Sequence, residues 1–189
     1  MQFIKPNVTY HPQYREMLDE WLADGSRIAP WTLHLPYASA EDFAALVARC
    51  EEVERGENIG DFAPNSTWWL YDEERDKLIG ACNLRHWLND TDGQLWGHIG
   101  YGIRPSERRK GYAALALQTM LQEAKARGLN EVLLGAYSSN IGSWKTMERC
   151  GARFLRSVLE DENDPNSEIK QYHITLRHKR TRCSGAFSS

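Results

Sequence analysis

The sequence predicts a single α/β domain in which helices flank a mixed, mostly antiparallel sheet. Three observations favour this class. Two amphipathic helical segments come first, three β-rich runs separated by short turns follow, and a helix then connects two further strands. Strands joined by short turns pair antiparallel, whereas a helix crossing between two strands produces parallel pairing. With 189 residues, the chain is long enough to bury one core.

Two helices are expected at the start of the chain. In residues 11–25 apolar side chains recur at helical spacing, and Gly25 provides a stop. In residues 39–56, Ser39 is a candidate N-cap, and Asp42 three residues later can complete a capping box. The connector between these helices is rich in aromatic residues and proline.

A meander of three strands is expected next, followed by a helix that opens after Gly111 and ends in a cationic turn near Gly128. A short helix is expected over residues 140–151. The expected strands cover residues 66–74, 77–88, 95–105, 131–139, 152–161 and 171–178. The domain is expected to span residues 1–178, with residues 179–189 as a disordered tail.

Composition excludes several classes of protein. A formal net charge of −3 argues against general nucleic-acid binding, which favours strongly basic domains. With no signal peptide and no long apolar run, the expected location is cytoplasmic, without a membrane partner. The four cysteines form no CxxC pair, so neither a metal site nor a disulfide framework is predicted.

A cluster of cations precedes the helix that opens after Gly111, in the segment RPSERRKGYAALALQTM. The start of a helix carries about half a positive charge and free N–H groups, so these cations call for an anion, such as a ligand with phosphates. The segment fits neither a P-loop nor the Rossmann fingerprint. It fits the pattern Arg108-x-x-Gly111-x-Ala113, in which small residues let the backbone approach a pyrophosphate.

These three residues, the strand HIGYGIRP before them and the later segment NIGSWKTMERCGARF resemble the GNAT superfamily of acyl-CoA N-acyltransferases. The resemblance covers residues 66–176. It implies a twisted sheet whose two central parallel strands splay apart at the cofactor cleft. The pantetheine arm of acetyl-CoA would lie in that gap and pair with strand backbone.

The resemblance also implies which residues meet acetyl-CoA. The backbone near Ile103 would meet the pantetheine, and Asn140, with Ser143 a turn later, would face it from the other side of the gap. The residues expected around the pyrophosphate are Arg108, Arg109, Lys110, Gly111, Tyr112, Ala113 and Ala114. The alternative is a basic surface loop before an ordinary core helix.

Acyl transfer to an amine needs a neutral amine, a stabilised oxyanion and a proton for the departing thiolate. His98 is the first candidate for the general base, because relatives often carry a glutamate there and imidazole titrates near neutral pH. The alternative is a histidine packed beside Trp96. Tyr101 stands at odd spacing from His98, so the two are expected on opposite faces of the strand.

The sequence offers several candidates for the general acid. The superfamily's usual tyrosine, seven residues after the helix-opening asparagine, is replaced here by Met147. Ser143 and Tyr137 are candidate substitutes, and water is a third. Cys150 raises the idea of a covalent intermediate, but its spacing from Met147 favours a packed small hydrophobe.

The acceptor pocket is expected to be bordered by His86, Trp87 and residues 30–37, where His34 and Tyr37 are candidates. Acidic residues in the helix over 39–56 would suit a cationic acceptor, although a solvated helix face explains them as well. The predicted function is transfer of an acetyl group from acetyl-CoA to a primary amine of a small molecule or peptide, in a ternary complex.

One other class stays open at this point, a catalytically weak acyl-CoA sensor or scaffold that would keep the cleft without the acid. A kinase-like nucleotide-binding protein is disfavoured, because no Lys-Ser/Thr follows the glycine and no carboxylate pair for a metal is evident. A homodimer is compatible with the sequence, but no motif specifies one.

Overall fold

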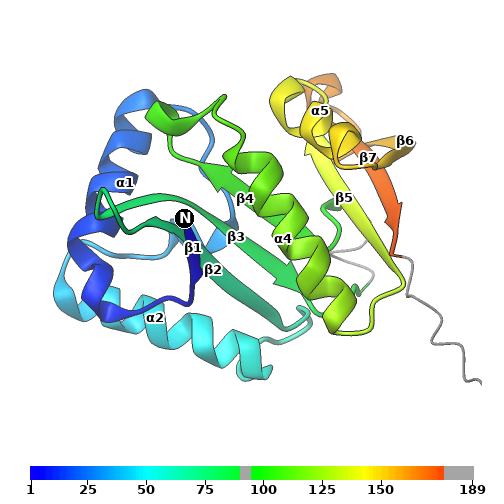
Figure 1. Cartoon of the computed structure of the whole chain (residues 1–189). Helices are drawn as coiled ribbons and strands as arrows, with labels where there is room; N and C mark the ends of the chain where they lie inside the picture. Colours follow the sequence, from blue (N-terminus) through cyan, green and yellow to red (C-terminus); the bar gives the residue numbers. More distant parts are fainter. Residues whose placement is uncertain (90–94, 177–189) are drawn as a thin grey trace, which may run out of the picture.

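A computed structural model describes residues 1–89 and 95–176 of the chain (Figure 1). The elements are β1 (Gln2–Ile4), α1 (His11–Asp24), α2 (Ala40–Arg55), β2 (Asn65–Asp72), β3 (Lys77–Arg85), β4 (Ile99–Ile103), α4 (Tyr112–Ala126), β5 (Glu131–Tyr137), α5 (Ile141–Arg149), β6 (Arg153–Leu159) and β7 (Glu168–Thr175). The predicted mixed α/β class is confirmed. The predicted tail lies outside the described residues.

The strands form two antiparallel sheets, in the orders β1-β2-β3-β4 and β5-β7-β6. Their edge strands β4 and β5 run in the same direction side by side, with α4 crossing from one to the other (Figure 1). The two edges meet where the N–H of His98 donates to the carbonyl oxygen of Leu133 at 2.8 Å. Among the described strands no parallel ladder joins them, so the splay expected at the centre divides the sheet in two.

Local signals account for most of the helix boundaries. Ser39 caps α2 and forms the predicted capping box with Asp42. Gly25 ends α1 in the left-handed conformation, with φ at +70°. Strand β1 was not predicted, because three residues are too short to show a period. Its pairing with β2 instead depends on a partner some 65 positions away, as the contact between Ile4 and Trp69 shows.

Two hydrophobic clusters cover opposite sides of the first sheet. One lies under α4 and includes Leu117 and Met120, and the other lies under α1 and α2 and includes the buried Trp21 and Trp69. Trp69 packs against Tyr14 with ring centres 5.1 Å apart, and such an aromatic pair contributes ~0.5–1.5 kcal/mol beyond the area that it buries. Together the clusters fix α1 and the start of α4 relative to β4.

The connector between α1 and α2 lies directly on β4 because that strand contains glycines. A Cβ at Gly102 would collide with the carbonyl oxygen of Ala29, and one at Gly100 would come within 3.2 Å of the Pro30 side chain. The connector can therefore form one wall of the space beside β4. Within the described residues, none of the helices has both the length and the apolar character to cross a bilayer.

Candidate functional site

The start of α4 presents backbone N–H groups without acceptors. Gly111 is the N-cap residue, with φ at +89° and no side-chain cap. Arg109, with φ at +61°, also has a positive value. Such left-handed residues turn successive N–H groups toward one side, which makes an anion-binding concavity. In the described part of the chain the N–H groups of Tyr112, Ala113 and Ala114 have no acceptor, so a phosphate suits this position.

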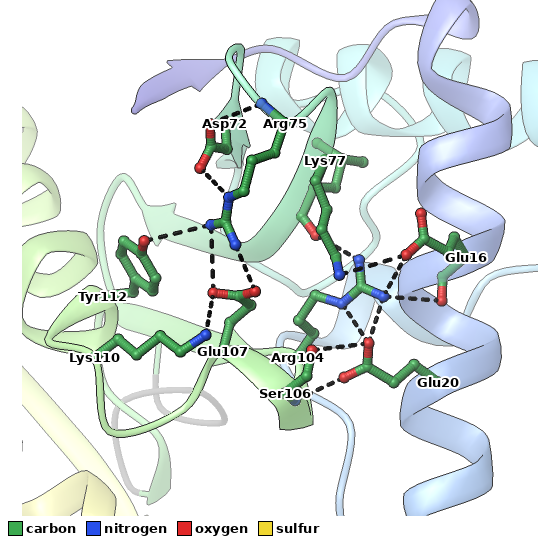
Figure 2. Close-up of polar contacts among 11 residues, drawn as sticks. Glu16, Glu20, Asp72, Arg75, Lys77, Arg104, Ser106, Glu107, Lys110 and Tyr112 are labelled. Carbon is green, nitrogen blue, oxygen red and sulfur yellow. Dashed lines mark hydrogen bonds and ion pairs between the residues drawn. The ribbon is translucent and has the colours of Figure 1, made fainter.

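Arg104 ties the end of β4 to α1 (Figure 2). Its side chain is only 1% exposed. Its Nε donates to Glu20 at 2.7 Å, and its Nη2 donates to Glu16 at 2.9 Å. Glu20 also accepts the N–H of Ser106 at 2.7 Å. Burial acts against ionisation of Glu20, but hydrogen bonds from Ser106 and Arg104 outweigh it and hold its pKa below the ordinary value.

Glu107 lies beneath the loop as a buried carboxylate, with 4% of its side chain exposed. Arg75, from the turn between β2 and β3, donates to it at 2.8 Å, and Lys110 of the loop donates at 3.0 Å (Figure 2). Burial opposes its ionisation, yet these two cations keep its pKa below the ordinary value. The loop is therefore anchored to the β2–β3 turn as well as to α1.

Most cations of the loop have carboxylate partners within the protein. The Nη1 of Arg108 contacts Asp24 at 3.2 Å, and its Nη2 donates to the Ser26 hydroxyl at 2.7 Å. Its Nε donates to the carbonyl oxygen of Ile103 at 3.1 Å. Only Arg109, among the cations of the described loop, is exposed and forms no ion pair. The expectation that a ligand must offset all these cations is corrected, because internal carboxylates already offset most of them.

A cavity of about 310 Å³ opens where β4 and β5 splay apart. Asn140, whose side chain caps α5 by accepting the Ser143 N–H at 3.2 Å, lines it. The Tyr101 hydroxyl lies 3.2 Å from the carbonyl oxygen of Ser143 and 3.1 Å from its Oγ. Met147 also lines the cavity. The predicted residues Asn140 and Ser143 thus meet Tyr101, which the sequence analysis did not assign to the site.

His98 lies outside the cavity lining, between β4 and β5. Its Nδ1 accepts the N–H of Leu133 at 3.0 Å. A neutral imidazole with Nδ1 used in this way carries its proton on Nε2, so it has no lone pair left for a substrate proton. Burial also lowers the pKa of His98 below the ordinary value. The geometry therefore does not support His98 as the base, and the predicted opposite orientation of Tyr101 agrees with the cavity lining.

His34 shows the reverse arrangement of ring nitrogens. It lines the cavity from the 3₁₀ turn Trp31–His34 of the connector. Its Nε2 lies 3.1 Å from the carbonyl oxygen of Ile28. A carbonyl oxygen can only accept, so Nε2 carries a proton, and in the neutral ring Nδ1 then keeps its lone pair, for which the described residues provide no donor. Periodicity could not distinguish the two histidines, because the difference depends on tertiary partners.

Three residues predicted to border the acceptor pocket lie outside the cavity lining, and so does Cys150, for which the sequence favours a packed small hydrophobe. His86 forms a 2.8 Å hydrogen bond between its Nε2 and the Ser66 hydroxyl. Trp87 is 56% exposed. Tyr37 packs edge-on against the α1 aromatic cluster. Cys150 is partly buried at the end of α5, and burial raises the pKa of its thiol, which does not suit a nucleophile.

Comparison with known proteins assigns the family. The model of the acetyltransferase (GNAT) domain matches residues 9–153. The chain belongs to the GNAT acetyltransferase family. A relative, the uncharacterized N-acetyltransferase YjdG of Bacillus subtilis (strain 168), is 28% identical over 86 residues, which is 45% of this chain and 49% of that protein. The match therefore spans about half the length of that relative.

Solved structures of GNAT acetyltransferases share the fold. RimL, a ribosomal L7/L12 alpha-N-protein acetyltransferase in complex with coenzyme A, superposes with a TM-score of 0.67 at 12% identity, covering 92% of this chain and 93% of that one. MccE, in complex with acetyl-CoA and AMP, gives 0.65 at 15% identity and covers 92% and 91%. A chimera of the spermidine N-acetyltransferase SpeG from Vibrio cholerae and hSSAT gives 0.61 at 16% identity and covers 93% and 96%.

Proposed function

We propose that this GNAT protein transfers an acetyl group from acetyl-CoA to a primary amine of a small molecule or peptide, by direct attack within a ternary complex. The observation that carries the proposal is the free N–H groups at the start of α4, together with the cavity between the splayed edges of β4 and β5. The pyrophosphate would bind at residues 109–114, and the pantetheine would extend along β4 toward Tyr101.

The comparisons support parts of this proposal. RimL and MccE, which share the fold, are complexes with coenzyme A and acetyl-CoA. RimL is described as an acetyltransferase of a ribosomal protein, and SpeG as an acetyltransferase of spermidine. Both descriptions support an amine as the acceptor. None of these comparisons favours a sensor. The cytoplasmic location, the homodimer and the absence of nucleic-acid and membrane partners stay predictions.

Tyr101 and Ser143 are suited to the departing thiolate. Burial raises the pKa of Tyr101 to about 12, so its hydroxyl keeps its proton at neutral pH. A thiol has a pKa of about 8.5, so transfer of the tyrosine proton to the thiolate is unfavourable. The two hydroxyls would instead donate hydrogen bonds to the sulfur, and water would protonate it afterwards. Tyr101 would thus stabilise the thiolate without replacing the acid that is missing at Met147.

His34 is suited to the amine proton. The amine nitrogen attacks the thioester carbonyl carbon and loses a proton, which the free Nδ1 of His34 accepts. The carbon–sulfur bond then breaks, leaving an amide and the coenzyme A thiolate. A base positioned in this way contributes roughly 100-fold to the rate or more.

The test combines binding with turnover. Calorimetric titration is expected to show binding of acetyl-CoA and coenzyme A, and neither ATP nor NAD should displace them. With a panel of amines and a thiol-release assay, His34→Ala is expected to lower kcat/KM about 100-fold without changing acetyl-CoA affinity. Tyr101→Phe should lower kcat about tenfold, because it removes one hydrogen bond from the tyrosine hydroxyl to the thiolate sulfur.

His98→Gln serves as the matched histidine control, because glutamine can still accept a backbone hydrogen bond. It is expected to keep turnover of the same order as the unmodified protein. If His98→Gln abolishes turnover while His34→Ala does not, the base is His98 and our assignment is wrong. If acetyl-CoA fails to bind, or if ATP displaces it, the proposed function fails.

A further inference from the structure

Arg27 stacks on an aromatic surface at the edge of the cavity. Its guanidinium carbon lies 4.2 Å from the ring centre of Tyr137 and 5.4 Å from that of Trp96. The two rings themselves meet edge to face at 5.1 Å. All three side chains line the cavity. The flat face of its guanidinium therefore holds the long, exposed side chain of Arg27 in place. This restriction reduces the conformational entropy that the side chain would lose on binding a ligand.

Part of the edge of the same guanidinium interacts with the Tyr137 hydroxyl, and the rest is available. A cation–π contact uses the flat face, whereas the five N–H donors lie in the plane of the group, so Tyr137 does not use all of them. Within the described residues, no carboxylate lies within ion-pair distance of Arg27, whereas Arg108, which also contacts the connector between α1 and α2, pairs with Asp24. Planar donors of this kind match a carboxylate or phosphate with two parallel hydrogen bonds.

The other charges in the lining do not favour a cationic acceptor. The charged side chains of the described lining are Arg27, Arg85 and Glu160. Glu160 accepts a hydrogen bond from the Tyr137 hydroxyl, which also interacts with Arg27, so Arg27 offsets part of the charge of this carboxylate. Arg85 donates to the carbonyl oxygen of Gly97 at 2.9 Å and makes further contacts. A polyamine would need several free carboxylates here, and the described lining does not supply them.

We propose that the amine acceptor also carries an anionic group, a carboxylate or a phosphate, which Arg27 binds while the amine reaches His34. This substrate class rests on the proposed acetyl transfer and makes it more specific. Trp31 and Trp96, which also line the cavity, would contact the apolar body of the acceptor.

Matched amine pairs test the proposal directly. Phenylalanine and phenethylamine differ by one carboxylate, and phosphoethanolamine and ethanolamine differ by one phosphate, so the two pairs distinguish the two anions. Spermidine is the cationic comparison. In the thiol-release assay, the anionic member of at least one pair is expected to have a kcat/KM about tenfold higher. Raising the ionic strength should reduce that preference.

Variants of Arg27 separate this proposal from the general one. Arg27→Gln is expected to remove the preference through KM, with kcat and acetyl-CoA affinity unchanged, and Arg27→Glu should shift the preference toward spermidine. Arg15→Gln, an exposed arginine of α1 outside the lining, is the control and should keep the preference. Turnover without an anion preference, or a preference that survives Arg27→Gln, would overturn the proposal. Absence of turnover with every amine would overturn the acetyl transfer itself and this proposal with it.

Discussion

Replacing both Glu16 and Glu20 by glutamine is expected to destabilise the protein by ~3–5 kcal/mol, because it leaves Arg104 as a buried cation without a carboxylate. Arg104 is 1% exposed and contacts both acids (Figure 2). Either single substitution leaves one carboxylate in place and should cost much less. The two effects are therefore expected to be non-additive. Urea unfolding monitored by tryptophan fluorescence measures all three variants.

A rescue makes this expectation specific. Adding Arg104→Met to the double variant removes the buried charge and should restore most of the stability, since an apolar group of similar length replaces a buried ionic cluster at little cost. The double variant Glu74→Gln/Glu162→Gln makes the same change of net charge on exposed side chains and serves as the control. Additive single effects, or no recovery with Arg104→Met, would contradict the role given to this cluster.

The same cluster predicts a pH dependence. The pKa of Glu20 is lower in the folded protein than its ordinary value of 4.5, so below that pH the unfolded chain binds more protons. Stability from this group is therefore complete above pH 4.5 and is lost as the pH falls through the folded pKa. Glu20→Gln should remove this part of the acid dependence in the same unfolding assay.

Gly111→Asp is expected to weaken acetyl-CoA binding about 1,000-fold relative to Gly111→Asn. This factor corresponds to the loss of two charge-assisted hydrogen bonds from the N–H groups of α4 to the pyrophosphate. The two side chains have the same shape and tolerate the positive φ of this position equally well. A Cβ at Gly111 meets no atom within 4 Å, so neither side chain is forced out by the protein. The aspartate carboxylate would occupy the free N–H groups of α4 and repel the pyrophosphate. Calorimetry with acetyl-CoA measures the difference.

The variants Gly111→Asp and Gly111→Asn also control for an effect on the stability of the protein. Aspartate and asparagine are both favourable at a helix start, so thermal unfolding of the two variants without ligand should be similar. Equal affinity of the two for acetyl-CoA would place the pyrophosphate elsewhere. The cations of the loop would then serve the internal ion pairs with Asp24 and Glu107 rather than a ligand.

Features with a local signal could be predicted from the sequence. The capping box of Ser39 and Asp42, the cap of Asn140 on Ser143 and the glycine at the start of α4 all depend on residues within a few positions of one another. The fold class followed from the order of these elements. Such signals survive because backbone geometry fixes them before tertiary packing does.

Features that depend on distant partners could not be predicted. Tyr101 and Ser143 are 42 positions apart, and Arg104 and Glu20 are 84 positions apart. The sequence pattern that contains the loop cations therefore could not indicate the distant carboxylates that offset their charge. His34 and His98 carry the same imidazole, and only the carbonyl or N–H group that each meets in the fold decides which ring nitrogen is free.

We expect the gap between β4 and β5 to let the two sheets open with different free energies. In the described chain an isolated bridge between Gly97 and Leu134 and the shared core under α4 join them, but no ladder does, so the sheet β5-β7-β6 is expected to open before β1-β2-β3-β4. Amide hydrogens of β6, which is largely exposed, are expected to exchange with solvent well before those of β3. Acetyl-CoA, bound to β4 on one side and to α5 on the other, would link the two sheets and slow exchange in both. Equal exchange in the two sheets of the free protein would show that the bridge and the shared core already couple them.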